Sequence, residues 1–197
     1  MGKKRKLVWG VGINDADYVV CRTLNGKRVW CPYYRKWLSM LERCYSAAEH
    51  VRRPNYADCT VVPEWLYFMT FRAWMLRQDW QGKQLDKDLL IQGNKVYGPK
   101  SCLFVTKEIN NLLNDHGAAR GDHAEGVYRY GRGKYIRFKP QISIDGEQKC
   151  LGYFEAEEEA TIVYRKAKGE YIRQVANEQS DMVLKAALYR QADKYYP

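Results

Sequence analysis

Apolar and polar positions alternate between Lys134 and Asp145, which is the period of a strand with one buried and one exposed face. The apolar row stands at the even positions Ile136, Phe138, Ile142 and Ile144. The other row stands at the odd positions Tyr135, Arg137, Lys139, Gln141, Ser143 and Asp145. Because this second row is basic, aromatic and able to hydrogen-bond, we expect it to face an anionic partner.

Residues on both sides of this strand complete a sheet and a helix. Residues 127–130 predict a first strand, and the Asp145-Gly146 pair is typical of a hairpin that leads into a third strand near residues 149–154. A helix is expected from Glu157, because carboxylates favour the positive end of a helix and an apolar stripe follows them. That stripe comprises Ala160, Val163, Tyr164, Ala167 and Tyr171. The pattern predicts a three-stranded antiparallel sheet packed on one helix.

The N-terminal half has a different pattern. Residues 8–20 and 28–30 predict strands around a turn at Asn25-Gly26, and Pro32 opens a helix. Residues 46–58 predict a loop. The later elements are expected to be a helix over 63–78, strands over 84–91 and 101–105, a helix capped by Thr106, and a last amphipathic helix over 181–195. The last helix either docks on one of the two modules or forms a dimer contact.

Composition narrows the partners and the compartment. The 197 residues carry a net charge of +10, which favours a polyanionic partner, because each Lys or Arg on a phosphate releases condensed counterions. The sequence has no apolar run long enough to span a membrane, and its six cysteines are too scattered for a secreted disulfide framework. We therefore expect a cytoplasmic protein with no membrane partner.

An ordered set of residues carries a family resemblance. The set is Gly126-Val127, Gly133-Lys134-Tyr135, Leu151-Gly152-Tyr153-Phe154, Glu157-Glu158-Glu159-Ala160 and Tyr164. It resembles the DNA-binding domain of the apetala-two/ethylene-response-factor family, which also occurs in phage and mobile-element proteins. The resemblance implies that the sheet enters the major groove of double-stranded DNA. It implicates Arg129, Arg132, Lys134, Tyr135, Arg137, Lys139 and Lys149. Tryptophan is usual where Tyr135 stands, so the family's base preference does not transfer.

A second set of residues is spread over positions 34–114. It comprises Trp37, Met40, Arg43-Cys44, Cys59, Glu64-Trp65, Phe68, Leu85-Asp86-Lys87, Gly93-Asn94, Tyr97, Pro99 and Cys102. Its spacing resembles that of phage HNH-endonuclease-like proteins. The resemblance implies a strand-strand-helix scaffold on which a histidine activates water and a divalent ion stabilises the leaving phosphate.

The expected catalytic centre departs from that family pattern. Lys87 stands where the histidine is expected, and a lysine with an ordinary pKa near 10.4 is protonated at neutral pH and is a poor base. If the module is active, the resemblance implies that Asp86, Lys87, Asp88 and His116 form the catalytic site, and Asp86, Asp88, Asn110 and His116 are candidates to hold Mg²⁺. In the alternative, the two aspartates form ion pairs with Lys87 or Lys95. We favour a module that has lost its catalytic histidine.

Cysteine spacing raises one more metal question. Cys44, Cys59 and Cys102, with Cys31 or His50 as a fourth ligand, are candidates for a structural zinc site. No Cys-x-x-Cys pair is present, however, and this is the spacing that makes a zinc assignment strong. We therefore favour buried, reduced thiols that pack against Trp37 and Trp65.

These observations combine into one hypothesis with two alternatives. The fold is expected to be α+β, with an HNH-like module over residues 1–116, a linker over 117–125, an apetala-two-like domain over 126–176 and a C-terminal helix over 177–197. The function is expected to be double-stranded DNA binding in a host cytoplasm, without a required cofactor. The basic arm of Lys3, Lys4, Arg5 and Lys6 is expected to add affinity. The alternatives are a homing or nicking HNH endonuclease that uses Mg²⁺, and a phage effector that binds and inhibits a host defence or transcription complex.

Overall fold

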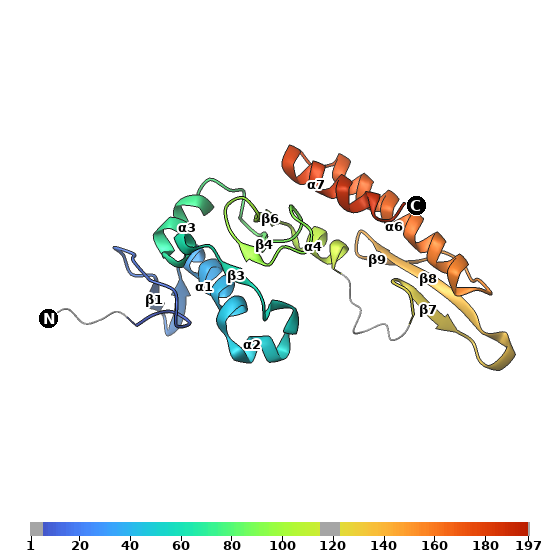
Figure 1. Cartoon of the computed structure of the whole chain (residues 1–197), viewed down its shortest axis with the longest axis horizontal. Coiled ribbons are helices and arrows are strands. Elements are labelled where there is room, and N and C mark those ends of the chain that lie inside the picture. The colour runs from blue at the N-terminus through green and yellow to red at the C-terminus, as the bar shows by residue number, and fades with distance from the viewer. Residues whose placement is uncertain (1–5, 115–122, 197) are drawn as a thin grey trace. The chain divides into compact units, whose positions relative to one another are not determined.

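The predicted α+β fold is confirmed, because helices and strands are interspersed along the whole chain in the computed structural model (Figure 1). The structure describes residues 6–114 and 123–196, except for the side chain of Lys134. The chain divides into unit 1, residues 1–106, and unit 2, residues 107–197. This boundary lies ahead of residue 116, where the sequence placed the end of the first module, so the helix α4 (Lys107–Leu113) belongs to unit 2. None of the helices in the described ranges has the length and apolar character needed to cross a membrane.

Unit 1 starts with a hairpin and continues as helices interleaved with short strands. The predicted helix that begins at Pro32 is confirmed. Proline fits the first turn of a helix because the N–H group that it lacks would have no hydrogen-bond partner within the helix there. The strands β3 and β5 pair in parallel, and β4 and β6 pair antiparallel. The elements are β1 (Cys21–Leu24), β2 (Lys27–Trp30), α1 (Pro32–Tyr45), α2 (Ala47–Arg52), η1 (Pro54–Tyr56), β3 (Thr60–Val61), η2 (Pro63–Leu66), α3 (Phe68–Met75), β4 (Gln84–Asp86), β5 (Val96–Tyr97) and β6 (Leu103–Val105).

Three predicted spans in unit 1 were wrong, because the backbone turns, is capped or becomes extended at single residues within them. Residues 8–20 form only isolated bridges, since Trp9 and Gly10 adopt positive φ angles of 51° and 77°. The predicted loop over 46–58 contains α2, whose N-terminus is capped by the side chain of Ser46. The predicted helix over 63–78 is interrupted at Tyr67, which has an extended backbone and forms a bridge with Ile13.

The two strands of the predicted strand-strand-helix segment are shorter than expected. β4 ends at Asp86 because the Asp86 carboxylate accepts hydrogen bonds from the backbone N–H groups of Asp88 and Leu89, at 3.0 and 2.7 Å. β6 starts at Leu103 because the Cys102 N–H is used in a turn with the carbonyl of Gly98. A carboxylate that accepts two backbone bonds favours a turn over a continued strand.

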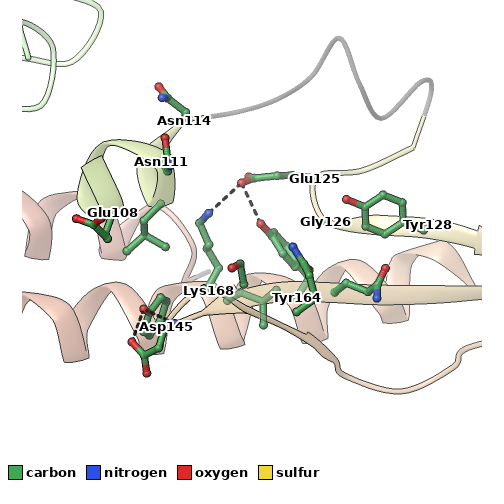
Figure 2. Close-up of a pocket in the computed structure, with 16 residues that line it drawn as sticks. Glu108, Asn111, Asn114, Glu125, Gly126, Tyr128, Asp145, Tyr164 and Lys168 are labelled. Carbon is green, nitrogen blue, oxygen red and sulfur yellow. Dashed lines mark hydrogen bonds and ion pairs between the residues drawn. The ribbon is translucent and has the colours of Figure 1, made fainter. Parts of the chain in front are cut away.

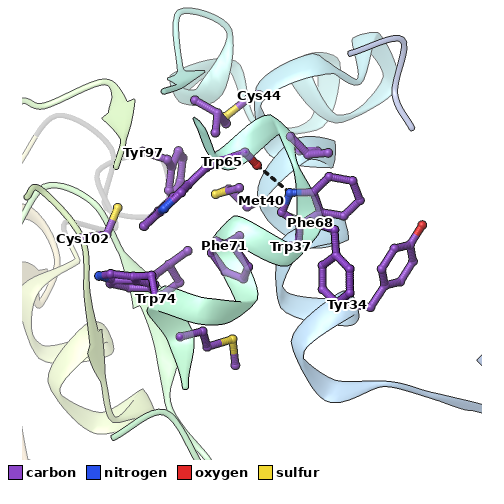
Figure 3. Packing of buried hydrophobic residues seen from close by; sticks show 14 of the residues in the cluster. Tyr34, Trp37, Met40, Cys44, Trp65, Phe68, Phe71, Trp74, Tyr97 and Cys102 are labelled. Atoms are coloured by element: carbon purple, nitrogen blue, oxygen red, sulfur yellow. Dashed lines mark hydrogen bonds between the residues drawn. The ribbon is translucent and has the colours of Figure 1, made fainter. Parts of the chain in front are cut away.

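The core of unit 1 is built largely from aromatic rings that α1, η2 and α3 bring together (Figure 3). Trp37 is fully buried, and its indole N–H donates to the carbonyl of Trp65 at 2.7 Å. The Trp65 ring packs on Phe71 and Trp74, with centroids 5.0 and 4.5 Å away. Cys44 and Cys102 pack in this cluster, as favoured from the sequence. The core therefore holds α1 and α3 in one fixed arrangement.

Unit 2 contains the predicted three-stranded antiparallel sheet, in the order β7-β8-β9, and the helix that covers it. α6 begins at Glu157, as predicted. α7 packs on it, as predicted in the first of the two alternatives for the last helix. α7 begins after Asp181, whose carboxylate accepts from the N–H groups of Val183 and Leu184. The elements are β7 (Val127–Tyr130), η3 (Gly133–Tyr135), β8 (Arg137–Ile144), β9 (Glu147–Cys150), α6 (Glu157–Asn177) and α7 (Met182–Asp193).

Two strand boundaries in unit 2 also differ from the prediction. β8 starts at Arg137 and not at Lys134, because residues 133–135 form a tight turn in which the Tyr135 N–H donates to the Arg132 carbonyl. β9 covers Glu147–Cys150, whereas the sequence placed it near 149–154. Phe154 instead forms an isolated bridge with Phe138 after the chain has left β9.

Candidate nucleic-acid interface

The register of the sheet sorts side chains onto two faces, because directly paired residues of an antiparallel sheet point to the same side. Tyr128 pairs with Lys139, and Tyr130 pairs with Arg137. We call the face that they share the outer face. By the same rule it comprises Tyr128, Tyr130, Arg137, Lys139, Gln141, Ser143, Gln148 and Cys150. Three strands thus gather a basic, aromatic and amide-bearing surface.

The opposite, inner face packs on α6. Val127 and Ile142 lie on it and are buried with Ala160 and Tyr164 of the helix. The predicted parity of β8 is therefore confirmed, with even positions turned toward the helix and odd positions turned away. Burial of the apolar row fixes the register, because a slip by one residue would exchange the two faces.

Two residues implicated by the family resemblance do not lie on the outer face. Arg129 pairs with Phe138, and Lys149 pairs with Ile142, so both point to the inner side of the sheet. Both side chains are exposed. A family motif gives residue positions but not the pairing of strands, so it cannot separate these two residues from Arg137 and Lys139.

Tyrosine rings dominate the outer face. Tyr128 and Tyr130 are 47% and 55% exposed, and Tyr153, which follows β9, is 54% exposed. The rings of Tyr130 and Tyr153 lie 5.1 Å apart, and the ammonium of Lys139 lies 6.0 Å from the centre of the Tyr130 ring. Exposed aromatic rings on a sheet can stack on nucleic-acid bases, and a neighbouring cation can contact phosphate at the same place.

The remaining predicted contacts surround this face. Arg137 forms an ion pair with Glu155 at 3.0 Å, and Glu155 is largely exposed. Tyr135 lies in the η3 turn and Arg132 directly precedes it, and both are exposed, Tyr135 to 69%. Lys6 of the basic arm is exposed as well. Outside the described part of the chain lie Lys3, Lys4, Arg5 and the side chain of Lys134.

In unit 1, the residues at the expected catalytic centre form a turn rather than an acid–base pair. The Lys87 side chain is buried, and its ammonium donates to the Asp88 carboxylate at 2.9 Å. Burial lowers the pKa of Lys87, but the hydrogen bond and charge of Asp88 outweigh burial and raise the pKa above its ordinary value. Lys87 is thus held protonated. Burial raises the pKa of Asp86, whose carboxylate already accepts two backbone bonds. His116 lies outside the described residues.

The cysteines proposed as zinc ligands are free and buried. Burial raises the pKa of the Cys44 and Cys102 thiols to about 12, and burial also raises the pKa of Cys59. Within residues 6–114 and 123–196, no three His, Cys, Asp or Glu side chains are grouped so that they could hold a metal ion. Bound zinc would ionise these thiols. A structural zinc site stays an untested alternative to the reduced thiols that we favour.

Comparison with known proteins gives no further guide. No family model, curated protein or solved structure matches this chain. The resemblances to the apetala-two and HNH families therefore stay predictions. Function has to be argued from the geometry of the chain itself.

A polar cluster missed by the sequence reasoning holds the sheet to its helix (Figure 2). The Glu125 carboxylate accepts from the hydroxyls of Tyr164 and Tyr195, at 3.1 and 3.2 Å, and its Oε1 lies 3.6 Å from the ammonium of Lys168. Lys168 is buried, and burial raises the pKa of Tyr164. This cluster borders a cavity of about 480 Å³. Through Glu125, the polar cluster ties the chain before β7 to α6 and to Tyr195, which follows α7.

A second carboxylate fixes the same segment. The Glu157 carboxylate accepts from the Ala124 N–H at 2.8 Å and contacts the His123 ring at 3.1 Å. The Ala124 bond, with the His123 contact, lowers the pKa of Glu157. The sequence offered one usable signal for these contacts, because Lys168 is a charged residue one position from the apolar stripe at Tyr164, Ala167 and Tyr171. Nothing in the sequence marks Glu125 as its partner.

Proposed function

We propose that this chain binds double-stranded DNA through the outer face of β7–β8–β9. One observation carries the proposal: the strand register gathers exposed tyrosines with Arg137 and Lys139 on the side of the sheet that α6 leaves open. The net charge of +10 adds support, because it attracts phosphate at long range. In this proposal, DNA binding by the outer face requires no metal ion.

Each kind of side chain has a role in such binding. Arg137 and Lys139 neutralise phosphates, and a phosphate can replace the exposed Glu155 carboxylate as the partner of Arg137. Gln141 and Gln148 carry amides that can form paired bonds with a base edge in the major groove. The tyrosine hydroxyls and rings contact the backbone and the sugar or base faces.

We propose further that unit 1 is an HNH-like module that does not cut DNA. Support comes from Lys87, which is buried, paired with Asp88 and held protonated, so it has no free electron pair to activate water. The Asp86 carboxylate is used to turn the chain. In this proposal the module contributes affinity and position, and the sheet contributes recognition.

The chain offers a matched pair of variants that tests the interface. Arg137→Gln/Lys139→Gln removes two charges from the outer face, and Arg129→Gln/Lys149→Gln removes two from the inner face of the same sheet. Loss of two phosphate contacts reduces the affinity for duplex DNA by about 30-fold near 0.15 M salt, since each contact changes the salt slope by about 0.9. We expect this loss in the outer-face variant and a change below about threefold in the inner-face variant.

The assay is fluorescence anisotropy with labelled duplexes, and single-stranded DNA and RNA of the same sequence serve as competitors. Equal losses in both variants would show that only net charge matters and would refute the outer-face assignment. A parallel incubation of plasmid with Mg²⁺ or Mn²⁺ tests the second part of the proposal. Metal-dependent nicking that disappears in Asp86→Ala would make the chain an endonuclease.

A further inference from the structure

The β1–β2 hairpin of unit 1 is an exposed, positively charged ribbon. Residues 22–29 are all exposed, and positions 21–30 contain Arg22, Lys27 and Arg28 but no acidic residue. The two strands are joined by Asn25-Gly26, whose φ angles of 51° and 75° are those of the tight turn that matches the twist of a hairpin. The ribbon is therefore regular and short, with cations along its length.

The base of the hairpin is fixed to the core of unit 1. The Trp30 ring stacks on Tyr34 with a centroid distance of 5.9 Å and an interplanar angle of 1°. The Cys31 N–H donates to the Val20 carbonyl at 2.8 Å, which closes the two strands at their base. Because its base is anchored, the backbone of the hairpin is already ordered before a partner binds. This preorganisation lowers the entropic cost of association.

The three hairpin cations differ from other cations of unit 1 in their ion pairing. In the described part of the chain, Arg22, Lys27 and Arg28 form no ion pair, whereas Arg52, Lys83 and Lys95 all do. Close, unpaired cations repel each other, and an external polyanion relieves that repulsion.

A fourth cation lies near the base. Arg72 lies between the rings of Tyr18 and Tyr33, 5.5 and 5.3 Å from their centres, and Tyr18 contacts Cys31 just after β2. The Arg72 Nε atom is buried without a hydrogen-bond partner, and the side chain has no ion pair within the described residues. The positive charge of the hairpin thus continues to its base, where Asp17 is the acidic residue that also acts on Tyr18.

The register places these cations on both sides of the ribbon. Arg22 pairs with Val29 and Lys27 with Leu24, so these two cations share one side, while Arg28 pairs with Thr23 on the other. A flat anionic surface, such as a membrane or an acidic protein patch, would engage one side. A groove of duplex DNA has phosphates along both walls, and a major groove about 12 Å wide admits a two-stranded ribbon whose strands lie about 4.8 Å apart.

We propose that the β1–β2 hairpin is a second DNA-contacting element, which enters a groove of the duplex and places Arg22, Lys27 and Arg28 on its phosphates. This inference rests on the proposed function, because it assigns unit 1 a contact with the same partner that the outer face binds. Since the hairpin carries few groups that distinguish bases, its contribution is affinity that varies little with DNA sequence.

The test compares three variants of the full chain. Arg22→Gln/Lys27→Gln/Arg28→Gln removes the hairpin charges, and Arg77→Gln/Lys100→Gln/Lys166→Gln removes as many from exposed positions outside both surfaces. Arg22→Lys/Arg28→Lys keeps the hairpin charge. The equilibrium constant for a labelled duplex is measured by anisotropy over a range of salt concentrations. Tryptophan fluorescence checks that unit 1 of each variant is folded, and far-UV circular dichroism checks the helices of both units.

We expect the slope of log K against log salt to fall by about 2.7 in the hairpin variant, because three phosphate contacts are lost. This loss weakens binding about 170-fold near 0.15 M salt. The dispersed variant is expected to change the slope by less than about 1, and the Lys variant to leave it unchanged. Equal slope changes in the hairpin and dispersed variants, or no change in either, overturn the inference. In both cases a loss of binding in Arg137→Gln/Lys139→Gln keeps the proposed function. Absence of duplex binding by the unmodified chain refutes both.

Discussion

Replacing Gly126 by alanine should destabilise unit 2 more than an ordinary glycine substitution. Gly126 has a φ of +70°, and a Cβ atom at this position would overlap the ring of Tyr164. An L-residue held at positive φ costs about 1–2 kcal/mol, and overpacking a filled core costs a further ~1–3 kcal/mol. The sum is a loss of about 2–5 kcal/mol in the free energy of unfolding, equivalent to a fall of roughly 10–30 °C in Tm for a domain of this size.

Gly146→Ala separates the two costs. Gly146 also has a positive φ, +84°, but a Cβ there would meet no atom within 4 Å, so we expect only the backbone cost of about 1–2 kcal/mol. Far-UV circular dichroism follows the helices of both units, whereas tryptophan fluorescence follows unit 1 alone, because all six tryptophans lie before residue 106. A shift in the circular dichroism transition without a shift in the tryptophan transition therefore reports unit 2. Equal destabilisation by Gly126→Ala and Gly146→Ala would refute the packing of Tyr164 on Gly126. A shift confined to the tryptophan signal would refute its assignment to unit 2.

Two further predictions follow from contacts in unit 2. The pKa of Glu157 is lowered in the folded state, so its ionised form stabilises unit 2 above the unfolded pKa of about 4.3, and this contribution is lost as pH falls through the folded pKa. Glu157→Gln should therefore be less stable than the unmodified chain at neutral pH, as measured by urea unfolding. The difference in the free energy of unfolding should shrink below about pH 4.3. A difference that does not change with pH would show that the ionised Glu157 carboxylate does not stabilise unit 2. Asp181→Ala removes the cap of α7 and should lower the free energy of unfolding of unit 2 by about 1 kcal/mol, measured by circular dichroism. Ser46→Ala uncaps α2 and should instead lower the transition that tryptophan fluorescence follows in unit 1. If each variant shifted the transition of the other unit, the caps would not act locally.

The sequence predicted those elements whose side-chain pattern decides their structure. The alternation in β8 and the stripe on α6 both follow from burial of one face, and burial is what the pattern records. The helix at Pro32 was found for the same reason. The failures occurred where a polar contact outweighs the pattern: the Asp86 carboxylate ended β4, Ser46 started α2, and the extended Tyr67 divided a helix that looked continuous.

The candidate site was predictable only in part. For the outer face, the sequence predicted only the side chains that β8 contributes, because alternation along one strand sorts the side chains of that strand and of no other. The faces of Arg129 and Lys149 depended on pairing between strands, which is a long-range contact that no local pattern contains. The Glu125, Lys168 and Tyr195 contacts join segments far apart in the sequence and were out of reach for the same reason. The hairpin, in contrast, was expected from its Asn-Gly turn, and its unpaired charge could be recognised only once its neighbours were known.

The outer face carries one chemically distinct atom. All six cysteines lie among the described residues, and Cys150 alone is exposed, while the others are buried or half-buried. Its thiol shares the face of Gln141, opposite the helix. An alkylating reagent added to the unmodified chain will therefore label this face first. Its rate of reaction, measured with the face empty or covered, turns the native sequence into its own footprinting probe and needs no substitution or attached dye.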